Sequence, residues 1–298
     1  MTTEAVVEKR SAGRKLAGLF HGRPRLETGS LLGGPLLWLV VVYLGSLVVL
    51  LVSAFWSVDP LSGELVQGFS LENFELLWNE AVYKDVIGRT VLIAALATVT
   101  DALLAFPIAF YMAKIASRRG KALLVVAILL PLWSSYLVKV LSWRTMLSSG
   151  GIINWALEPL GLEGPGYGLT AVWLVMSYLW LPYMILPIYA GLERVPDSLF
   201  EASADLGAGS VTTLRRVVFP VVFPAVVAGS IFTFSLTMGD YIAVKIVGGT
   251  SQLLGNVVYD NQGAANNLPF ACAVATVPIV VMLVYLAAAR RTGALEQL

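Results

Sequence analysis

The sequence predicts an all-α integral membrane protein with six transmembrane helices, and three observations support this fold class. Of the 298 residues, 57% are hydrophobic and only 13% are charged, whereas soluble domains usually carry about 25% charged residues. The hydrophobic residues form long stretches, and a helix needs roughly 20 of them to cross the hydrocarbon core. The alternating segments of about ten residues that build membrane β-barrels are absent, so hydrogen bonding of the backbone in lipid requires helices.

These stretches divide the chain into a basic N-terminal tail (1–30), a membrane domain (31–290) and a C-terminal tail (291–298). The first stretch is longer than the apolar core of about 7–15 residues in a cleavable signal peptide, so we interpret it as a retained anchor. Prolines and glycines within the stretches are either ordinary membrane-helix composition or kinks that shape a pathway, and both interpretations stay open. The predicted spans are Leu31–Trp56, Val86–Lys114, Ala122–Trp143, Thr170–Ala190, Val217–Val247 and Leu268–Ala289.

The distribution of charge predicts that both termini are cytoplasmic. Asp and Glu dominate the connections on the other side, and cytoplasmic loops of membrane proteins carry the excess of Lys and Arg. An even number of spans agrees with two termini on one side. The basic residues on the predicted cytoplasmic side are Lys9, Arg10, Arg14, Lys15, Arg23, Arg25, Lys114, Arg118, Arg119, Lys121, Arg194, Arg215, Arg216, Arg290 and Arg291.

The most informative connection is the loop 191–219 between the fourth and fifth spans, on the predicted cytoplasmic side. Ser198 and Glu201 have the Ser-x-x-Glu spacing of a capping box, which predicts the start of a helix. Gly207 is well placed as the left-handed residue that ends it. A helix this short is not stable by itself in water, because isolated helices need about 12–15 residues even for marginal helicity.

An apolar stripe on this short helix predicts that something covers it. Leu199, Ala202 and Leu206 fall on one helical face, which is the pattern of a face that packs against another surface. Either the helix packs on the chain's own helix ends, or it docks into a partner protein.

The same loop carries a family resemblance. Glu201-Ala202-Ser203-Ala204-Asp205-Leu206-Gly207-Ala208, followed by Phe219-Pro220, resembles the EAA loop of permease subunits in ATP-binding-cassette (ABC) importers. Ser203 and Phe219 depart mildly from the family pattern, in which Ala and Leu or Ile are common. The resemblance implies a type I ABC importer permease fold, whose EAA loop forms a coupling helix seated in a groove of the ATPase. The implied coupling residues are Leu199, Glu201, Ala202, Asp205, Leu206, Gly207 and Ala208.

The resemblance also implies partners and a location. We expect ABC ATPase subunits, a second homologous permease subunit and an extracytoplasmic solute-binding protein, all at a bacterial inner membrane. The chain contains no Gly-x-x-x-x-Gly-Lys-[Ser/Thr] phosphate loop, so ATP and Mg²⁺ are expected in a partner subunit, with no cofactor and no enzymatic activity in this chain. The net charge of +1 gives no general attraction to nucleic acid.

Four further segments narrow the resemblance to the spermidine/putrescine-type permeases, which implies a polyamine as the solute. These segments are Phe69–Phe74, Leu130–Lys139, Gly239–Tyr241 and Leu268–Phe270. The alternative function that the composition leaves open is an ion-coupled secondary transporter or a channel.

Two carboxylates within the predicted spans are candidates for the solute pathway. Asp101 is near the middle of the second span, where a carboxylate costs about 2.5–3.5 kcal/mol on insertion scales. It either makes a hydrogen bond between helices or a pair with a basic residue, or it lines the pathway. Asp240 lies toward the external end of the fifth span, near Lys245, whose ammonium we expect at the membrane interface. Aromatic residues of the third and fourth spans either stack on a cation or anchor the interface. The candidate pathway-lining residues are Asp101, Trp133, Ser135, Tyr136, Asp240 and Tyr241.

Other chemistries are excluded by composition. One histidine, His21, and one cysteine, Cys272, cannot build a histidine-based catalytic or metal site or a disulfide framework. Gly239-Asp240 and Tyr259-Asp260 echo the two motifs of intramembrane aspartyl proteases, but in reversed order and with Thr237 in place of the first glycine. The sequence therefore predicts no catalytic and no metal-binding residues.

Overall fold

The computed structural model describes residues 32–294, and the chain divides into two compact units, residues 1–53 and 54–298. The predicted tail 1–30 and residues 295–298 lie outside the described residues. In the first unit, Leu32–Ser53 form one apolar helix of 22 residues, which confirms the first predicted span. This helix contains a π-helical segment, η1 (Leu39–Leu44), followed by α3 (Gly45–Ser53).

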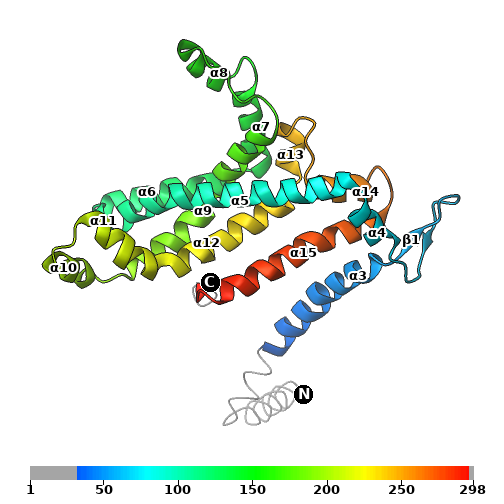
Figure 1. Ribbon diagram of the computed structural model, residues 1–298, viewed down its shortest axis with the longest axis horizontal. Coiled ribbons are helices and arrows are strands. Elements are labelled where there is room, and N and C mark those ends of the chain that lie inside the picture. Colours follow the sequence, from blue (N-terminus) through cyan, green and yellow to red (C-terminus); the bar gives the residue numbers. More distant parts are fainter. Residues whose placement is uncertain (1–31, 295–298) are drawn as a thin grey trace, which may run out of the picture. The chain divides into compact units, whose positions relative to one another are not determined.

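The second unit is a set of helices with one short hairpin, in which β1 (Ser57–Val58) pairs antiparallel with β2 (Leu65–Val66). Figure 1 shows these elements coloured along the chain. In order, the helical elements are α4 (Glu72–Asn79), α5 (Ala81–Phe110), η2 (Tyr111–Ile115), α6 (Arg118–Trp133), α7 (Tyr136–Leu147), α8 (Ile152–Leu157), η3 (Glu158–Leu160), α9 (Leu169–Glu193), α10 (Ser198–Asp205), α11 (Ser210–Thr213), η4 (Leu214–Val218), α12 (Phe219–Gly239), α13 (Ile242–Val247), α14 (Leu254–Gln262) and α15 (Leu268–Arg290).

The predicted fold class is confirmed. Among the described residues, five helices are long and apolar enough to cross a membrane, and six if the bent pair α6–α7 counts as one span. The second, fourth and sixth predicted spans correspond to the helices Ala81–Ile115, Leu169–Glu193 and Leu268–Arg290.

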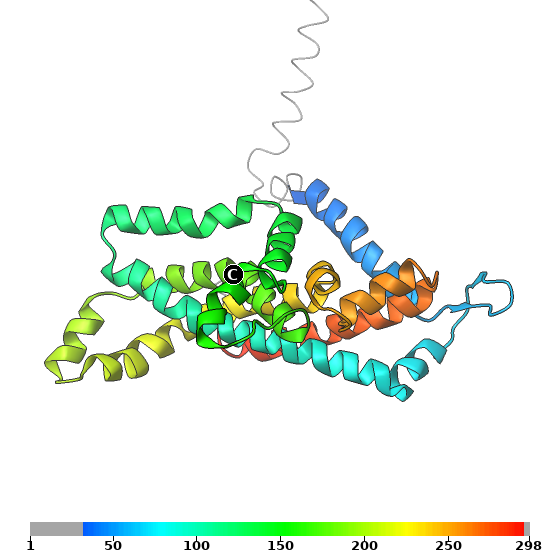
Figure 2. The same cartoon turned by 90° about the horizontal axis from the view of Figure 1, so that it is seen from above.

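The third predicted span, Ala122–Trp143, is wrong as one continuous helix. The chain bends by 94° between α6 and α7 (Figure 2). Ser134 takes an extended conformation, and both its amide (3.3 Å) and its hydroxyl (3.0 Å) donate to the Pro131 carbonyl. The Lys139 ammonium donates to the same carbonyl at 3.2 Å. A serine side chain can hydrogen-bond to nearby backbone groups in place of the regular helical hydrogen bonds. A prediction from long apolar stretches alone does not detect such a break.

The fifth predicted span, Val217–Val247, also ends earlier than expected. α12 stops at Gly239, and Asp240 is extended, with φ −77° and ψ 127°. Its carboxylate oxygen Oδ1 accepts a hydrogen bond from the Ala243 amide at 2.9 Å. This bond ties Asp240 to the first turn of α13, whose N-cap residue, Tyr241, has no side-chain cap of its own.

Helices α5, α9 and α12 pack against one another, and α15 packs against α12 and α14 (Figure 1). Two glycines allow α9 and α12 to approach closely. A Cβ at Gly191 would lie 2.6 Å from the Cβ of Ala225, and a Cβ at Gly229 would lie 2.8 Å from the Met184 sulfur and 3.2 Å from its Cα. Small residues at helix contacts are typical of membrane bundles, where van der Waals packing holds helices together.

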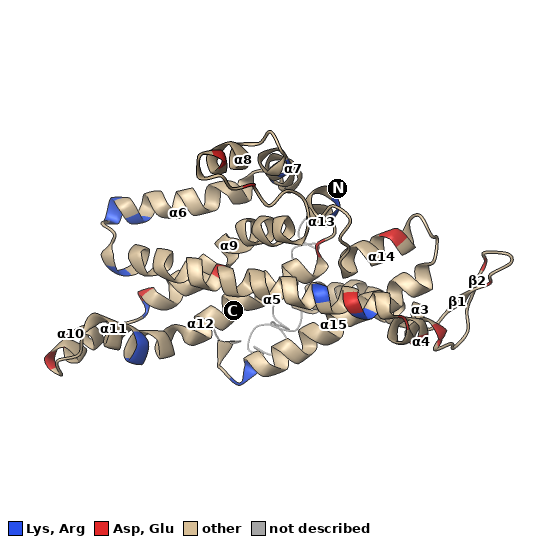
Figure 3. Ribbon diagram, turned by 45° about the horizontal axis from the view of Figure 1, so that its top comes forward, with Lys and Arg blue, Asp and Glu red and all other residues tan. Residues whose placement is uncertain are grey.

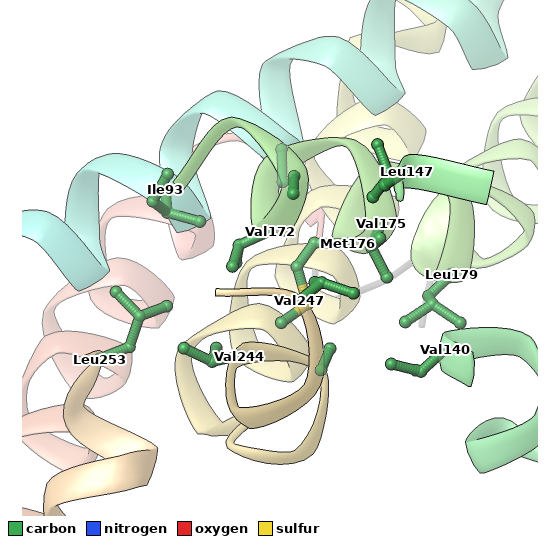
Figure 4. Packing of buried hydrophobic residues seen from close by; sticks show 13 residues of the cluster. Ile93, Val140, Leu147, Val172, Val175, Met176, Leu179, Val244, Val247 and Leu253 are labelled. Carbon is green, nitrogen blue, oxygen red and sulfur yellow. The ribbon is translucent and has the colours of Figure 1, made fainter. Parts of the chain in front are cut away.

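A buried apolar cluster joins α13 to the long helices. Val244 and Val247 of α13 belong to one buried cluster with Val172 and Met176 of α9 and Ile93 of α5 (Figure 4). The short helix after the break at Asp240 is therefore fixed to the bundle.

The two ends of the second unit differ in charge. Lys and Arg lie at the start of α6, in η4 and at the end of α15, whereas acidic residues lie on α4, on α14 and near the hairpin (Figure 3). We call the end that carries α10 and α11 the α10 end, and the end that carries α13 and α14 the α13 end. Their orientation in a membrane stays a prediction.

Candidate functional site

At the α10 end, the predicted coupling helix exists as α10, but its start differs from the prediction. The capping box between Ser198 and Glu201 is wrong, because no side chain caps the start of α10. The Glu201 amide, which the Ser198 hydroxyl was expected to cap, instead donates to the carbonyl of Asp197 at 3.2 Å. The helical turn begins before Ser198, so the amide that its hydroxyl would accept from is already used.

The end of α10 agrees with the prediction. Gly207 has φ +75°, the left-handed conformation that glycine adopts without steric cost. The Gly207 amide donates to the Ala204 carbonyl at 2.8 Å, and the Ala208 amide donates to the Ser203 carbonyl at 3.0 Å. These two bonds form a Schellman motif and satisfy carbonyls that the helix end would otherwise leave free.

The predicted apolar stripe is divided between two environments. Leu199 is half-buried and packs, with Phe200, against the cluster of η2, α9 and α12. Leu206 is 88% exposed, and Ala202 is exposed as well. Of the other predicted coupling residues, Glu201, Asp205 and Gly207 are exposed and Ala208 is half-buried. The chain covers one part of α10 and leaves the other part uncovered.

Lys114 anchors the entry to α10, and sequence reasoning missed this role. Its ammonium donates to the Val195 carbonyl at 2.6 Å and to the Asp197 carboxylate at 2.9 Å. It also lies 5.5 Å from the centre of the Phe200 ring. Lys114 ends the predicted second span, and its partners lie more than eighty residues further along the chain, so only the fold reveals the contact.

Two further polar contacts hold the segment around α10. The Lys121 ammonium and the Tyr189 hydroxyl both bind a Glu193 carboxylate oxygen, each at 2.7 Å. The hydroxyls of Ser203 and Thr213 are buried and lie 2.7 Å apart, which ties α10 to α11. A buried hydroxyl pair of this kind fixes geometry, because separating it leaves unsatisfied polar groups.

At the α13 end, a cavity of about 310 Å³ lies where α12 gives way to α13. Most of its wall is apolar or aromatic, and among the described residues Asp240 supplies the one charged group of the wall. Ligand pockets usually measure about 300–1,000 Å³ and combine apolar walls with a few polar groups. The lining residues are Tyr136, Trp180, Ser235, Leu236, Gly239, Asp240, Tyr241 and Ile242.

The Asp240 carboxylate is held in place from two sides. Its Oδ2 accepts a hydrogen bond from the Tyr136 hydroxyl, and its Oδ1 accepts one from the Ala243 amide. The Tyr136 ring stacks on Trp180, with centroids 6.1 Å apart and an interplanar angle of 20°. A carboxylate beside aromatic faces is an arrangement that attracts an organic cation, because the charge and the ring quadrupoles act together.

The structure brings three predicted pathway residues together and leaves three elsewhere. Tyr136, Asp240 and Tyr241 all line the cavity. Trp133 is 88% exposed and Ser135 is exposed, and neither lines it. Sequence reasoning placed Trp180 among possible stacking residues, but it missed Ser235 and Leu236, which carry no signal beyond their position on α12.

Asp101 lies within α5, away from the cavity. It is fully buried, and neither carboxylate oxygen has a hydrogen-bond partner among the described residues. Among the described residues, Asp101 forms neither the hydrogen bond between helices nor the pair with a basic residue that the sequence left open, and the pathway role stays a prediction.

Comparisons with known proteins agree with the membrane fold and with one family. Residues 89–292 match the family described as binding-protein-dependent transport system inner membrane component. The sequence is 43% identical over 299 residues to the inner membrane ABC transporter permease protein YdcU of Escherichia coli, with 95% of each chain covered. It is 33% identical over 210 residues to the spermidine/putrescine transport system permease protein PotB of Haemophilus influenzae, with 69% of this chain and 73% of the relative covered.

The fold is also similar to that of a solved transporter. A chain of a bacterial alginate ABC transporter, crystallised with an alginate pentasaccharide-bound periplasmic protein, superposes with a TM-score of 0.69 over 92% of this chain and 96% of that chain. The sequence identity is 15%, so this likeness concerns the fold alone.

Proposed function

The chain belongs to the binding-protein-dependent transport system inner membrane component family, and from this premise we propose that it forms the pathway for a polyamine in an ABC importer. Family membership decides against an ion-coupled secondary transporter or a channel. The single observation that carries the choice of solute is the α13-end cavity, where the Asp240 carboxylate lies among aromatic and apolar side chains.

The chemistry of a polyamine fits this wall. Alkyl ammonium groups like that of Lys, with a pKa of about 10.4, are protonated at neutral pH. Such a cation pairs with a carboxylate and with aromatic faces, while its methylene chain contacts apolar walls. Spermidine and putrescine also appear in the name of the Haemophilus influenzae relative.

We further propose that ATP hydrolysis in partner ATPase subunits drives transport through α10. The exposed Leu206 and the ordered turn at Gly207 supply a docking surface, and the contacts of Lys114 fix its position on the bundle. In this proposal the α10 end faces the cytoplasm, as the excess of Lys and Arg indicates. The α13 end then receives the solute from an extracytoplasmic binding protein, beside a second permease subunit.

The test is uptake of radiolabelled putrescine and spermidine by the assembled importer in proteoliposomes, with Asp240→Asn as the variant. Loss of the charge should reduce uptake about tenfold or more, since a close cation–carboxylate contact contributes about 1.5–3 kcal/mol. Asp85→Asn, an exposed residue of the same type at the start of α5, is the matched control and should keep parental uptake. Normal polyamine uptake by Asp240→Asn would refute the proposed role of the cavity.

Dependence on ATP is tested separately. With ion gradients clamped, removal of ATP should stop uptake, because the proposed energy source is hydrolysis in the partner subunits. Uptake that continues without ATP would refute the coupling part of the proposal.

A further inference from the structure

A second group of residues at the α13 end already holds a primary ammonium, and this ammonium belongs to the chain itself. The Lys245 Nζ lies 3.9 Å from the centre of the Tyr259 ring and 2.8 Å from the Asp260 Oδ1. A nitrogen this close to a ring centre lies over a face, because within the ring plane it would overlap the ring atoms. One carboxylate and one aromatic face therefore share the charge.

This group is continuous with the cavity. Tyr241 lines the cavity and also stacks on Tyr259, with ring centroids 4.6 Å apart and planes inclined by 18°. α14, which carries Tyr259, packs directly on the turn that carries Asp240: a Cβ at Gly255 would lie 2.9 Å from the Asp240 carbonyl oxygen. The Asn256 side-chain amide, which is buried, donates to the Tyr241 carbonyl at 3.1 Å. The two sites are thus connected through packed rings and a hydrogen-bonded turn.

The Lys245 ammonium is open to exchange. Tyr259 is 45% exposed, and the side chains of Lys245 and Asp260 are 43% and 38% exposed. Ion pairs that water reaches this easily are held weakly. An ammonium on a dissolved molecule can therefore compete with Lys245 for the same ring and carboxylate.

We propose that Tyr259 and Asp260 form an outer ammonium subsite, which Lys245 occupies in this conformation and which an ammonium group of the solute takes over before the solute enters the cavity behind Tyr241. This proposal rests on the proposed function. Two ammonium subsites that are joined through the stacked rings of Tyr241 and Tyr259 suit a solute with two or more amines along a flexible chain. The lysine keeps the outer subsite neutralised when solute is absent.

The test compares the KM and the maximal rate of putrescine and spermidine uptake in proteoliposomes that hold the whole importer. Lys245→Gln removes the competing ammonium and should lower KM for both polyamines severalfold. Tyr259→Leu and Asp260→Asn remove parts of the subsite and should raise KM severalfold with a smaller change in maximal rate. Tyr259→Phe restores the ring and should recover most of the affinity that Tyr259→Leu loses.

A contact that only pins α13 to α14 gives a different pattern. In that case Lys245→Gln would leave KM unchanged or raise it, and Asp260→Asn would lower the maximal rate without raising KM; either result would overturn the outer subsite. If either result were found while Asp240→Asn still abolished uptake, the proposed role of the cavity would hold and the proposed outer subsite would be refuted. Should Lys245→Gln not assemble with its partner subunits, Asp260→Asn decides alone: a raised KM with an unchanged maximal rate supports the subsite, and an unchanged KM overturns it.

Discussion

The two ends of the helical unit use polar groups in opposite ways. At the α13 end, Asp240, Tyr136 and the start of α13 turn their polar groups toward one another around a cavity. At the α10 end, the Lys114 ammonium binds the Val195 carbonyl just before α10, while Leu206 at the end of α10 is exposed. In the proposal above, the ordered and exposed turn at the α10 end contacts another protein, whereas the carboxylate in the apolar cavity binds a small cation.

The helix α12 joins these two ends. It follows η4 at the α10 end and stops at Gly239, directly before Asp240 (Figure 1). Close packing at Gly191 and Gly229 holds the first half of α12 against α9. Because packed interiors deform little, we expect a displacement of α10 to reach the cavity by movement of these helices rather than by local unfolding.

The largest effect on coupling is expected from Gly207→Val. Gly207 has φ +75°, and a Cβ at this position would meet no atom within 4 Å, so the substitution acts through the backbone and not through a clash. A non-glycine residue in the left-handed region costs about 1–2 kcal/mol, and β-branching adds to this. We expect about a tenfold loss of uptake per ATP hydrolysed, with normal membrane insertion.

Gly209→Ala is the matched control for this substitution. Gly209 has φ −70°, and a Cβ there also meets no atom within 4 Å. It should keep parental uptake and parental ATP hydrolysis. Equal behaviour of the two variants would show that the left-handed turn has no part in coupling.

A smaller, severalfold loss of uptake is expected from Lys114→Gln, which removes the anchor of α10. Hydrogen bonds that involve a charged group contribute about 1.5–3 kcal/mol, but the Asp197 side chain is 82% exposed and its share is screened. Asp197→Asn should therefore have less effect than Lys114→Gln, because the bond to the Val195 carbonyl remains. The measurement is the ratio of solute uptake to ATP hydrolysis in the assembled importer.

Two further variants test whether the effect of Lys114→Gln comes from the lost anchor or from the lost positive charge. Arg119→Gln removes a nearby exposed positive charge and should leave the ratio unchanged. Lys114→Arg keeps a donor and should restore part of the coupling. A loss of equal size in Arg119→Gln would mean that overall charge, and not the anchor, is responsible.

The contrast between the ends also explains what sequence could predict. Long apolar stretches set the positions of most spans, because the cost of exposing the backbone to lipid acts over whole helices. Gly207 was predictable from its place after a short periodic segment, since a local conformational preference decides it. Tyr136, Asp240 and Tyr241 came from resemblance, and the structure groups them in one cavity.

The features that sequence missed depend on single hydrogen bonds or on distant partners. The break at Ser134 is accompanied by hydrogen bonds to the Pro131 carbonyl, and the end of α12 by the hydrogen bond from the Ala243 amide to Asp240, both within long apolar stretches of sequence. The Lys114 anchor joins residues far apart in the chain. Composition and periodicity do not record such contacts.

The smallest effect on uptake is expected from Leu206→Ala. Its comparison with Leu199→Ala tests whether Leu206 contacts a partner while Leu199 packs on the chain itself. Leu206 is 88% exposed, so its truncation should leave the thermal stability of the isolated permease unchanged and weaken retention of the ATPase subunits during purification. Leu199 packs on the bundle, so its truncation should destabilise the isolated permease by about 1–2 kcal/mol, less than the 2–5 kcal/mol of a fully buried leucine. Lower thermal stability of the isolated Leu206→Ala permease, with ATPase retention unchanged, would mean that the chain covers this residue itself and that α10 offers no apolar contact to a partner.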